Sequence, residues 1–393
     1  MASVLTDCPH REKLGWLEEA HLMQYSVQYR YNLARLYEKT FNDMRSTQAA
    51  NGMIPTIAPE LVEFEGGFKD TPEWGSTFVI SPWYIYQWYG DTRPIETYYP
   101  DMQRYIDYLS SKADNHIISY GLGDWFDIGP KSPGESQLTS NGVTATAIYY
   151  YDVTLMEKMA NLLGKPDDAC KYQDLAAQIK QAFNQTFWNP STRTYDRNSQ
   201  AANAVALYME LTTSENRQQV FDNLIADIRR RNNALTAGDV GLRALEAGGA
   251  SDVIYDMNCK YDTPGYGWQL AHGATALTES WQAYGFVSNN HFMLGHLMEW
   301  LFSGLGGIRQ KEDSFGFKHI VIKPEPVGDV RDAQVSYKSP YGQIVSDWKD
   351  NDKEFIIRVE VPANSKASIY LPAADTKQIT ESGVRLEDVP EIN

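Results

Sequence analysis

The spacing of apolar residues changes once along this 393-residue chain, and that change limits the possible folds more than any other feature. From residue 17 to about residue 305, apolar residues recur at three- and four-residue intervals, as they do on one face of a helix. An early example is the set Val27, Tyr31, Ala34, Tyr37 and Phe41. Gly, Pro, Asn and Asp separate such segments, and these residues commonly end helices. The sequence therefore predicts a helical domain over residues 1–305.

This helical domain has few ways to close. After the first helix, further helices are predicted near residues 77–90, 96–112, 143–163, 167–186, 200–211, 213–230, 239–248, 250–259, 272–284 and 289–303. Helices in consecutive pairs can form a six-hairpin toroid, the (α/α)6 barrel, or an open α-solenoid. Long loops rich in Trp, Gly and Asp favour a compact domain with a functional end. We expect a mainly α fold, an (α/α)6 barrel that is complete or lacks its first helix.

The pattern after residue 305 is that of short strands. Residues 320–322, 343–348, 354–361 and 367–371 are rich in β-branched and aromatic side chains. Asp350, Asn351 and Asp352 stand between two of these runs and are typical of a hairpin turn. We therefore predict a small C-terminal antiparallel β-sandwich over residues 306–393.

Composition narrows the classes of partner. A net charge of −16 offers no basic surface for phosphate backbones, so we expect no nucleic-acid partner and a neutral substrate. No run of 18 apolar residues is present, and the first residues lack a signal-peptide pattern, so we expect no membrane span and a cytoplasmic location. Cys8, Cys170 and Cys259 match no disulfide framework or zinc spacing, and we expect no metal and no cofactor.

The first chemically informative stretch precedes the first helix. Residues 7–19 contain four carboxylates, from Asp7, Glu12, Glu18 and Glu19, together with an Arg and a Trp. Glycoside cleavage needs a proton donor on one side of the bond and a second carboxylate on the other, and this stretch could supply the donor. The alternative is a loop leading into a helix, with Glu18 and Glu19 placed in the first turn for the helix dipole.

Two more stretches combine acidic and aromatic residues. Residues 123–127 read Gly-Asp-Trp-Phe-Asp, which suits a cleft wall, although a turn with a self-bonded Asp explains it equally well. Residues 268–291 contain Glu279 at an otherwise apolar predicted helix start, where a carboxylate is costly to bury unless it is paired or protonated. Glu279 is therefore a candidate base, or else a helix-capping or solvent-facing Glu. His291 could bind sugar or be a satisfied core histidine.

Together these stretches resemble the bacterial α-L-rhamnosidases of glycoside hydrolase family 78. The family loop Asp-Cys-Pro-x-Arg-(Asp)-Glu-Arg-Leu-Gly-Trp is similar to residues 7–16. The family's Gly-Asp-Trp matches residues 123–125, and its Gly-Ala-Thr-x-x-x-Glu-x-Trp matches residues 273–281. Its Asn-His matches residues 290–291, and the tail looks like its C-terminal β-domain.

The resemblance implies a glycosidase that releases terminal α-L-rhamnose from a rhamnose-containing glycoside with inversion at the anomeric carbon. It implies that Glu12 is the general acid and Glu279 the general base. It places Asp7, Trp16, Glu19 and Trp125 at the sugar subsite. The remaining candidates for substrate binding are Arg11, Trp74, Asp124, Tyr266, Trp268 and His291. An aromatic wall around the C6 methyl group is expected from Trp16, Trp74, Trp125, Tyr266 and Trp268.

The chain also departs from the family pattern. A Trp-x-Asp pattern common in the family reads Trp74-Gly75-Ser76 here, which removes one carboxylate. Only six residues precede the Asp-Cys-Pro loop. Two alternatives therefore stay open: another (α/α)6 glycosidase, and a non-catalytic or incomplete carbohydrate-binding fragment. The sequence gives neither the aglycone nor the oligomeric state.

Overall fold

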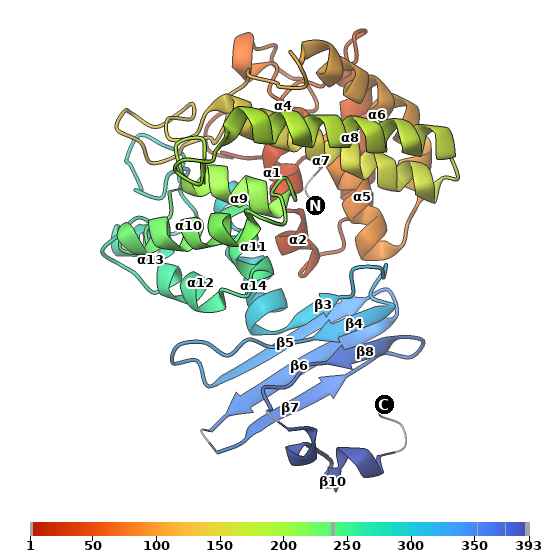
Figure 1. Cartoon of the computed structure of the whole chain (residues 1–393), viewed down its shortest axis with the longest axis vertical. Coiled ribbons are helices and arrows are strands. Elements are labelled where there is room, and N and C mark those ends of the chain that lie inside the picture. The colour runs from red at the N-terminus through yellow and green to blue at the C-terminus, as the bar shows by residue number, and fades with distance from the viewer. Residues whose placement is uncertain (1–2, 237–239, 352, 374, 390–393) are drawn as a thin grey trace. The chain divides into compact units, whose positions relative to one another are not determined.

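The computed structural model describes residues 3–236, 240–351, 353–373 and 375–389. The chain divides into two compact units, residues 1–301 and residues 302–393 (Figure 1). The first is built of helices and the second of strands. None of the described helices is long and apolar enough to cross a bilayer.

The helices of the first unit follow one another in pairs, and neighbouring helices such as α7 and α8 lie side by side (Figure 1). Their bounds are α1 Leu17–Leu22, α2 Gln24–Gln28, α3 Ala34–Thr47, α4 Pro72–Gly75, α5 Thr77–Tyr89, α6 Arg93–Lys112, α7 Asn141–Leu162, α8 Pro166–Phe187, α9 Gln200–Tyr208, α10 Arg217–Arg230, α11 Val240–Ala247, α12 Ser251–Asn258, α13 Tyr266–Ala271 and α14 Leu297–Trp300.

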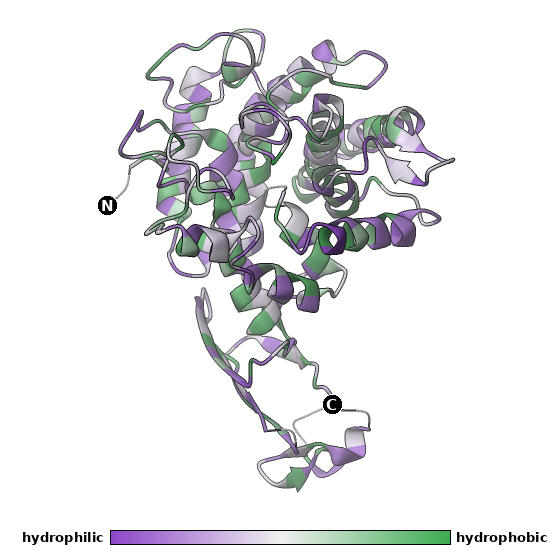
Figure 2. Cartoon of the chain, turned by 90° about the vertical axis from the view of Figure 1, so that its left-hand side faces the viewer, coloured by the Kyte–Doolittle hydropathy of each residue, from purple (hydrophilic) through white to green (hydrophobic). Residues whose placement is uncertain are grey.

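Two kinds of helix alternate in this unit, and their sequences explain why. Helices α5, α7 and α9 are buried on most sides and carry apolar or small residues all round. Helices α6, α8 and α10 bury one face and keep charged residues on the other. A helix that is apolar all round must be enclosed, whereas an amphipathic helix covers a core. From α5 to α10, consecutive helices therefore alternate between an inner and an outer position. Figure 2 shows that the helical unit contains helices of mixed hydropathy.

The predicted helices over residues 77–90, 143–163 and 167–186 are confirmed within two residues at each end by α5, α7 and α8. The helix predicted over residues 239–248 corresponds to α11, although residue 239 lies outside the described residues. The helix predicted over residues 289–303 is broken into a 3-10 turn Phe292–Leu294, α14 and a π-helical turn Leu301–Leu305.

The helix predicted over residues 272–284 is wrong, because this segment is a loop. Thr278 donates its hydroxyl hydrogen bond to the Ser280 carbonyl oxygen at 2.7 Å, and the Gln269 side chain accepts from the Thr278 backbone N–H at 3.3 Å. Such side-chain bonds compete with helical backbone bonds. The Trp281 ring is buried in this loop conformation, so the apolar residue at this position does not require a helix.

The interior of the helical unit holds ionisable side chains that are shielded from water. Glu73 is 6% exposed and its two carboxylate oxygens have no hydrogen-bond partner among the described residues. It lines a cavity of about 70 Å³ with Glu18 and His21. Burial raises the pKa of Glu73 to about 7, and the nearby Thr144 hydroxyl offsets only part of this. Burial also lowers the pKa of His21 to about 3, so its ring is neutral at pH 7.

Glu73→Gln is expected to stabilise the protein at pH 8. The folded state raises the pKa of Glu73 above its ordinary value of 4.5, so the folded state binds the proton more tightly than the unfolded state does. In the wild-type protein, the cost of ionising Glu73 destabilises the folded state. This destabilisation is absent below about pH 4.5, grows as the pH rises, and is complete above about pH 7, where it reaches about 3 kcal/mol. Thermal melts at pH 8 and pH 5 measure the effect, with exposed Glu38→Gln as the control. A Glu73→Gln variant that is no more stable than wild type at pH 8 would contradict the expectation.

The second unit contains two three-stranded sheets, ordered β3-β4-β8 and β5-β6-β7. The strands are β3 Ile308–Gln310, β4 His319–Ile322, β5 Asp332–Ser339, β6 Gly342–Asp350, β7 Phe355–Glu360 and β8 Lys366–Ile369. Ile320 and Ile322 of one sheet and Ile344 and Trp348 of the other are fully buried at alternate positions, as in a sandwich core.

Four of these six strands, β3, β5, β6 and β7, have only antiparallel partners, as predicted, but one pairing differs from the antiparallel expectation. Strand β8 pairs with β4 in parallel, with Ile320 opposite Ala367. The chain leaves β4, forms the whole β5-β6-β7 sheet and then returns, and a connection of that length permits parallel entry. The predicted turn is confirmed at Asn351, whose side chain accepts from the Glu354 backbone N–H at 3.0 Å. Asp352 of the same prediction lies outside the described residues.

Candidate active site

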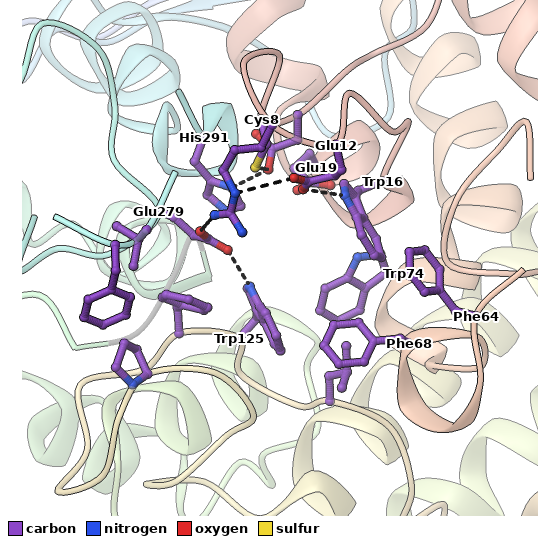
Figure 3. A pocket seen from close by; sticks show the side chains of 17 residues that line it. Cys8, Glu12, Trp16, Glu19, Phe64, Phe68, Trp74, Trp125, Glu279 and His291 are labelled. Atoms are coloured by element: carbon purple, nitrogen blue, oxygen red, sulfur yellow. Dashed lines mark hydrogen bonds and ion pairs between the residues drawn. The ribbon is translucent and has the colours of Figure 1, made fainter. Parts of the chain in front are cut away.

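One pocket of about 470 Å³ collects most of the residues that the sequence singled out (Figure 3). The predicted residues that line it are Asp7, Arg11, Glu12, Trp16, Glu19, Trp74, Trp125, Glu279 and His291. The three motifs are distant in sequence but meet in this pocket. The additional lining residues are Cys8, Phe64, Phe68, Leu122, Phe126, Pro133, Phe286 and Val287.

The loop that carries Glu12 is fixed at its base by the last motif. The Cys8 backbone N–H donates to the Asn290 carbonyl oxygen at 3.1 Å. The Phe292 backbone N–H donates to Asp7 Oδ1 at 3.3 Å, and His291 Nδ1 forms an ion pair with Asp7 Oδ2. Cys8 has a positive φ of 48°, a strained conformation that the surrounding bonds stabilise. The first and last stretches of the helical unit are thereby joined at the pocket.

The loop that replaces the predicted 272–284 helix presents Glu279 to the pocket. The Glu279 backbone N–H donates to the Ser288 carbonyl oxygen at 2.9 Å, and the Ser288 backbone N–H donates to Glu279 Oε2 at 3.0 Å. Trp125 Nε1 donates to Glu279 Oε1 at 3.4 Å. Each oxygen of this carboxylate therefore has a donor, which fixes the direction in which it points.

Arg11 contacts both candidate catalytic carboxylates, Glu12 and Glu279, which Figure 3 labels. Its Nη1 atom is 3.2 Å from Glu279 Oε2, and its Nε atom is 3.7 Å from Glu12 Oε2. Trp16 Nε1 donates to Glu12 Oε1 at 3.4 Å. One guanidinium group thus contacts both carboxylates, so the two carboxylates lie in the same part of the pocket.

Two further carboxylates in the pocket have opposite electrostatic environments. For Asp7, burial acts to raise the pKa, but the hydrogen bond and charge of His291 and the Cys8 thiol outweigh it, and the pKa lies below its ordinary value. For Glu19, burial together with the charges of Asp7 and Glu18 holds the pKa well above its ordinary value. At neutral pH Asp7 is therefore ionised and accepts hydrogen bonds, whereas Glu19 is disposed to keep a proton and donate one.

Aromatic rings form the wall on the Glu12 side. Phe64 stacks on Trp16, with ring centroids 5.4 Å apart and planes at 22°. The Phe68 and Trp74 rings both pack edge to face on Trp125. Their ring centroids lie 5.5 Å and 6.4 Å, respectively, from that of Trp125. In Figure 3 Trp16, Phe64 and Phe68 lie across the pocket from Glu279, whereas Trp125 lies beside it. The pocket therefore offers flat apolar faces next to its carboxylates.

Three predicted binding residues lie outside this pocket. Asp124 lines the smaller interior cavity beside Glu73. Tyr266 donates its hydroxyl hydrogen bond to the Leu294 carbonyl oxygen and packs on Trp281. Trp268 stacks on His272 and donates to the Gln282 carbonyl oxygen at 3.1 Å. Tyr266 and Trp268 help to hold the loop that carries Glu279, so the predicted aromatic wall retains only Trp16, Trp74 and Trp125.

The sequence reasoning missed the contribution of residues 60–68. Phe64 and Phe68 come from this segment, which mixes acidic and aromatic residues before Gly66 and Gly67. A short 3-10 helix Gly66–Phe68 brings the ring of Phe68 to the pocket. An aromatic and Gly-rich loop is a recognisable signal for a cleft rim, but it does not say which cleft.

The ligating atoms of Asp7, Cys8 and His291 lie within 4.8 Å of one another, which is the kind of spacing that a metal ion can use. In this arrangement they bond to one another instead. Cys8 Sγ donates to Asp7 Oδ2 at 3.1 Å, and burial raises the pKa of the Cys8 thiol well above its ordinary value. In this arrangement the neutral thiol serves as a hydrogen-bond donor to Asp7.

Comparison with known proteins agrees with this architecture. Residues 1–305 match the family model described as the bacterial alpha-L-rhamnosidase 6 hairpin glycosidase domain. Residues 307–385 match the bacterial alpha-L-rhamnosidase C-terminal domain. The predicted fold, a six-hairpin helical domain followed by a small strand-rich domain, is thereby confirmed.

Similar curated proteins and solved structures bear the same name. An alpha-L-rhamnosidase from Streptomyces avermitilis is 29% identical over 404 residues, which cover 98% of this chain and 38% of that protein. The structure of alpha-L-rhamnosidase from Dictyoglumus thermophilum aligns with a TM-score of 0.88 and 29% identity, covering 96% of this chain and 43% of that one.

The crystal structure of Streptomyces avermitilis alpha-L-rhamnosidase complexed with L-rhamnose aligns with a TM-score of 0.86 and 27% identity, covering 97% of this chain and 38% of that one. This chain thus spans about two fifths of the length of these relatives. On the family matches over both of its units, the chain belongs to the bacterial α-L-rhamnosidases with a six-hairpin glycosidase domain.

Proposed function

We propose that this chain forms the sugar-cleaving part of an α-L-rhamnosidase that inverts the anomeric carbon. The observation that supports the proposal is that two carboxylates, those of Glu12 and Glu279, contact different nitrogen atoms of the same Arg11 guanidinium group. An inverting glycosidase needs about 6.5–9.5 Å between its two carboxyl groups, because a water molecule must fit beside the sugar. A separation set by one guanidinium group suits that requirement.

In this proposal Glu12 gives a proton to the leaving oxygen of the glycoside. Glu279 takes a proton from water, and the water oxygen forms its bond to the anomeric carbon on the opposite face as the glycosidic bond breaks. The hydrogen bonds from Trp125 and the Ser288 backbone keep Glu279 oriented toward that water. Asp7 and Glu19 would hold the sugar hydroxyls, one as an acceptor and the other as a donor.

The direct test is hydrolysis of 4-nitrophenyl α-L-rhamnoside by the purified chain, followed by proton NMR. We expect release of nitrophenol and the first appearance of β-L-rhamnose, which mutarotates afterwards. Initial appearance of the α anomer would contradict inversion while leaving the rhamnosidase activity in place. Binding of L-rhamnose without turnover of any rhamnoside would favour the alternative, a carbohydrate-binding fragment.

A further inference from the structure

Two kinds of side chain line the pocket. Carboxylates and His291 form one kind, and the rings of Phe64, Phe68, Phe126 and Phe286 belong to the other. Two of these rings are unusually open to solvent: Phe68 is 39% exposed and Phe286 is 67% exposed. Exposed rings that line a pocket are typical of a surface that covers an apolar ligand.

The position of Glu12 shows which part of a substrate meets these rings. A general acid must reach the leaving oxygen, so the leaving group lies next to the acid. Glu12 accepts the hydrogen bond of Trp16, and Phe64 stacks on that Trp ring. In Figure 3, Trp16, Phe64 and Phe68 stand on the same side of the pocket as Glu12 and across from Glu279. The leaving group, the aglycone, therefore faces this aromatic stack.

The charges around the pocket disfavour an acidic aglycone. Four carboxylates line it, and among the described lining residues Arg11 is the one Lys or Arg. Arg11 is already paired with Glu12 and Glu279. Residues 60–68, which carry Phe64, add exposed Glu63 and Glu65 and half-buried Glu60, and Lys69 forms an ion pair with Glu63. A carboxylate on the aglycone would find repulsion rather than a partner.

We propose that the aglycone subsite selects a neutral, flat aromatic group, and that Phe64 and Phe68 are its specificity-determining residues. The inference rests on the proposed function and adds the class of leaving group. Aromatic stacking on Phe64 orders the aglycone, and the acidic rim excludes uronic acids and other anionic groups from the same position.

The test compares two leaving groups in the same variants. 4-Nitrophenyl α-L-rhamnoside carries an aromatic aglycone, and 2,2,2-trifluoroethyl α-L-rhamnoside carries a small aliphatic one that is also a good leaving group. For each protein, kcat/KM for the aryl substrate is divided by kcat/KM for the alkyl substrate. Because each variant is compared with wild type, the intrinsic reactivity of the two substrates cancels. We expect Phe64→Ala to lower this ratio about three- to tenfold, and Phe64→Tyr to restore it.

The matched control is Leu61→Ala, an apolar truncation in the same segment at a residue that is 69% exposed and does not line the pocket. Its ratio should equal that of wild type. If Phe64→Ala does not fold, Phe68→Ala provides the same comparison. A ratio unchanged in a folded Phe64→Ala variant that hydrolyses both substrates would overturn the aglycone proposal alone. Failure of wild type to hydrolyse either substrate would overturn the proposed function and the aglycone proposal with it.

The predicted exclusion of anionic aglycones is tested with a second pair of substrates. A 4-carboxyphenyl and a 4-(methoxycarbonyl)phenyl α-L-rhamnoside are similar in size and differ by one negative charge. We expect kcat/KM for the carboxylate to be several-fold lower at low salt, and the difference to shrink as salt screens the exposed rim charges. Equal or faster hydrolysis of the carboxylate at low salt would overturn the exclusion of anionic aglycones.

Discussion

Replacing Glu12 by Gln is expected to lower kcat/KM about 10²–10⁴-fold for an alkyl α-L-rhamnoside, because the leaving alkoxide needs the proton that Gln cannot give. The loss should be much smaller for 4-nitrophenyl α-L-rhamnoside, since nitrophenolate leaves without a proton. This dependence on the leaving group separates a general acid from a residue that only binds sugar. The measurement is a series of rhamnosides with leaving groups of increasing pKa, compared between the variant and wild type.

The control for Glu12→Gln is Glu312→Gln, the same change at an exposed residue of the second unit. Its rates should equal those of wild type for every substrate. An equal loss for alkyl and nitrophenyl rhamnosides in Glu12→Gln would remove Glu12 from the role of acid. The Trp16 indole, which donates to Glu12, can also donate to a Gln oxygen, so the side-chain position should be kept.

Replacing Glu279 by Gln is expected to lower kcat about 10²–10⁴-fold for alkyl and nitrophenyl rhamnosides alike. Water must be deprotonated whatever the leaving group, so the loss should not follow the leaving-group pKa. The amide oxygen of Gln can still accept from Trp125 or from Ser288, which makes the substitution conservative in shape.

Glu279→Gln also removes one of the two anionic partners of Arg11, so stability must be measured beside activity. Arg11 is about half exposed, and an ion pair of that kind contributes little, so the melting temperature should change by only a few degrees. Affinity for free L-rhamnose, measured by calorimetry, should stay within about tenfold of wild type. Near-normal kcat in this variant would exclude Glu279 as the base.

Much of this protein followed from its sequence because local patterns carry that information. The inner helix α5 is apolar all round, and the outer helix α6 is amphipathic, so their burial could be read from residue spacing alone. The change to short β-branched runs marked the second unit in the same way. The motif around Glu12 and the motif around Glu279 were recognisable because each is a continuous run of residues.

Other features were decided only by tertiary contacts. The spacing around Glu279 is that of a helix, yet side-chain hydrogen bonds of Thr278 and Gln269 hold a loop there, and a short sequence window cannot weigh such bonds against helical ones. The sequence suggests that the rings of Tyr266 and Trp268 line the pocket. In the structure, their polar atoms instead donate hydrogen bonds to the backbone carbonyl oxygens of Leu294 and Gln282. Whether an aromatic ring faces a ligand or supports a loop depends on where the backbone turns.

The sequence by itself determined the helical and strand-rich units and the two catalytic candidates, because each depends on residues close together in the chain. The tertiary structure alone decided that Arg11 joins Glu12 to Glu279, and that Phe64 completes the wall beside Trp16. The physical reason is that both contacts link segments far apart in sequence. Only closure of the helical unit brings residue 279 to residue 11, and no local pattern encodes that distance.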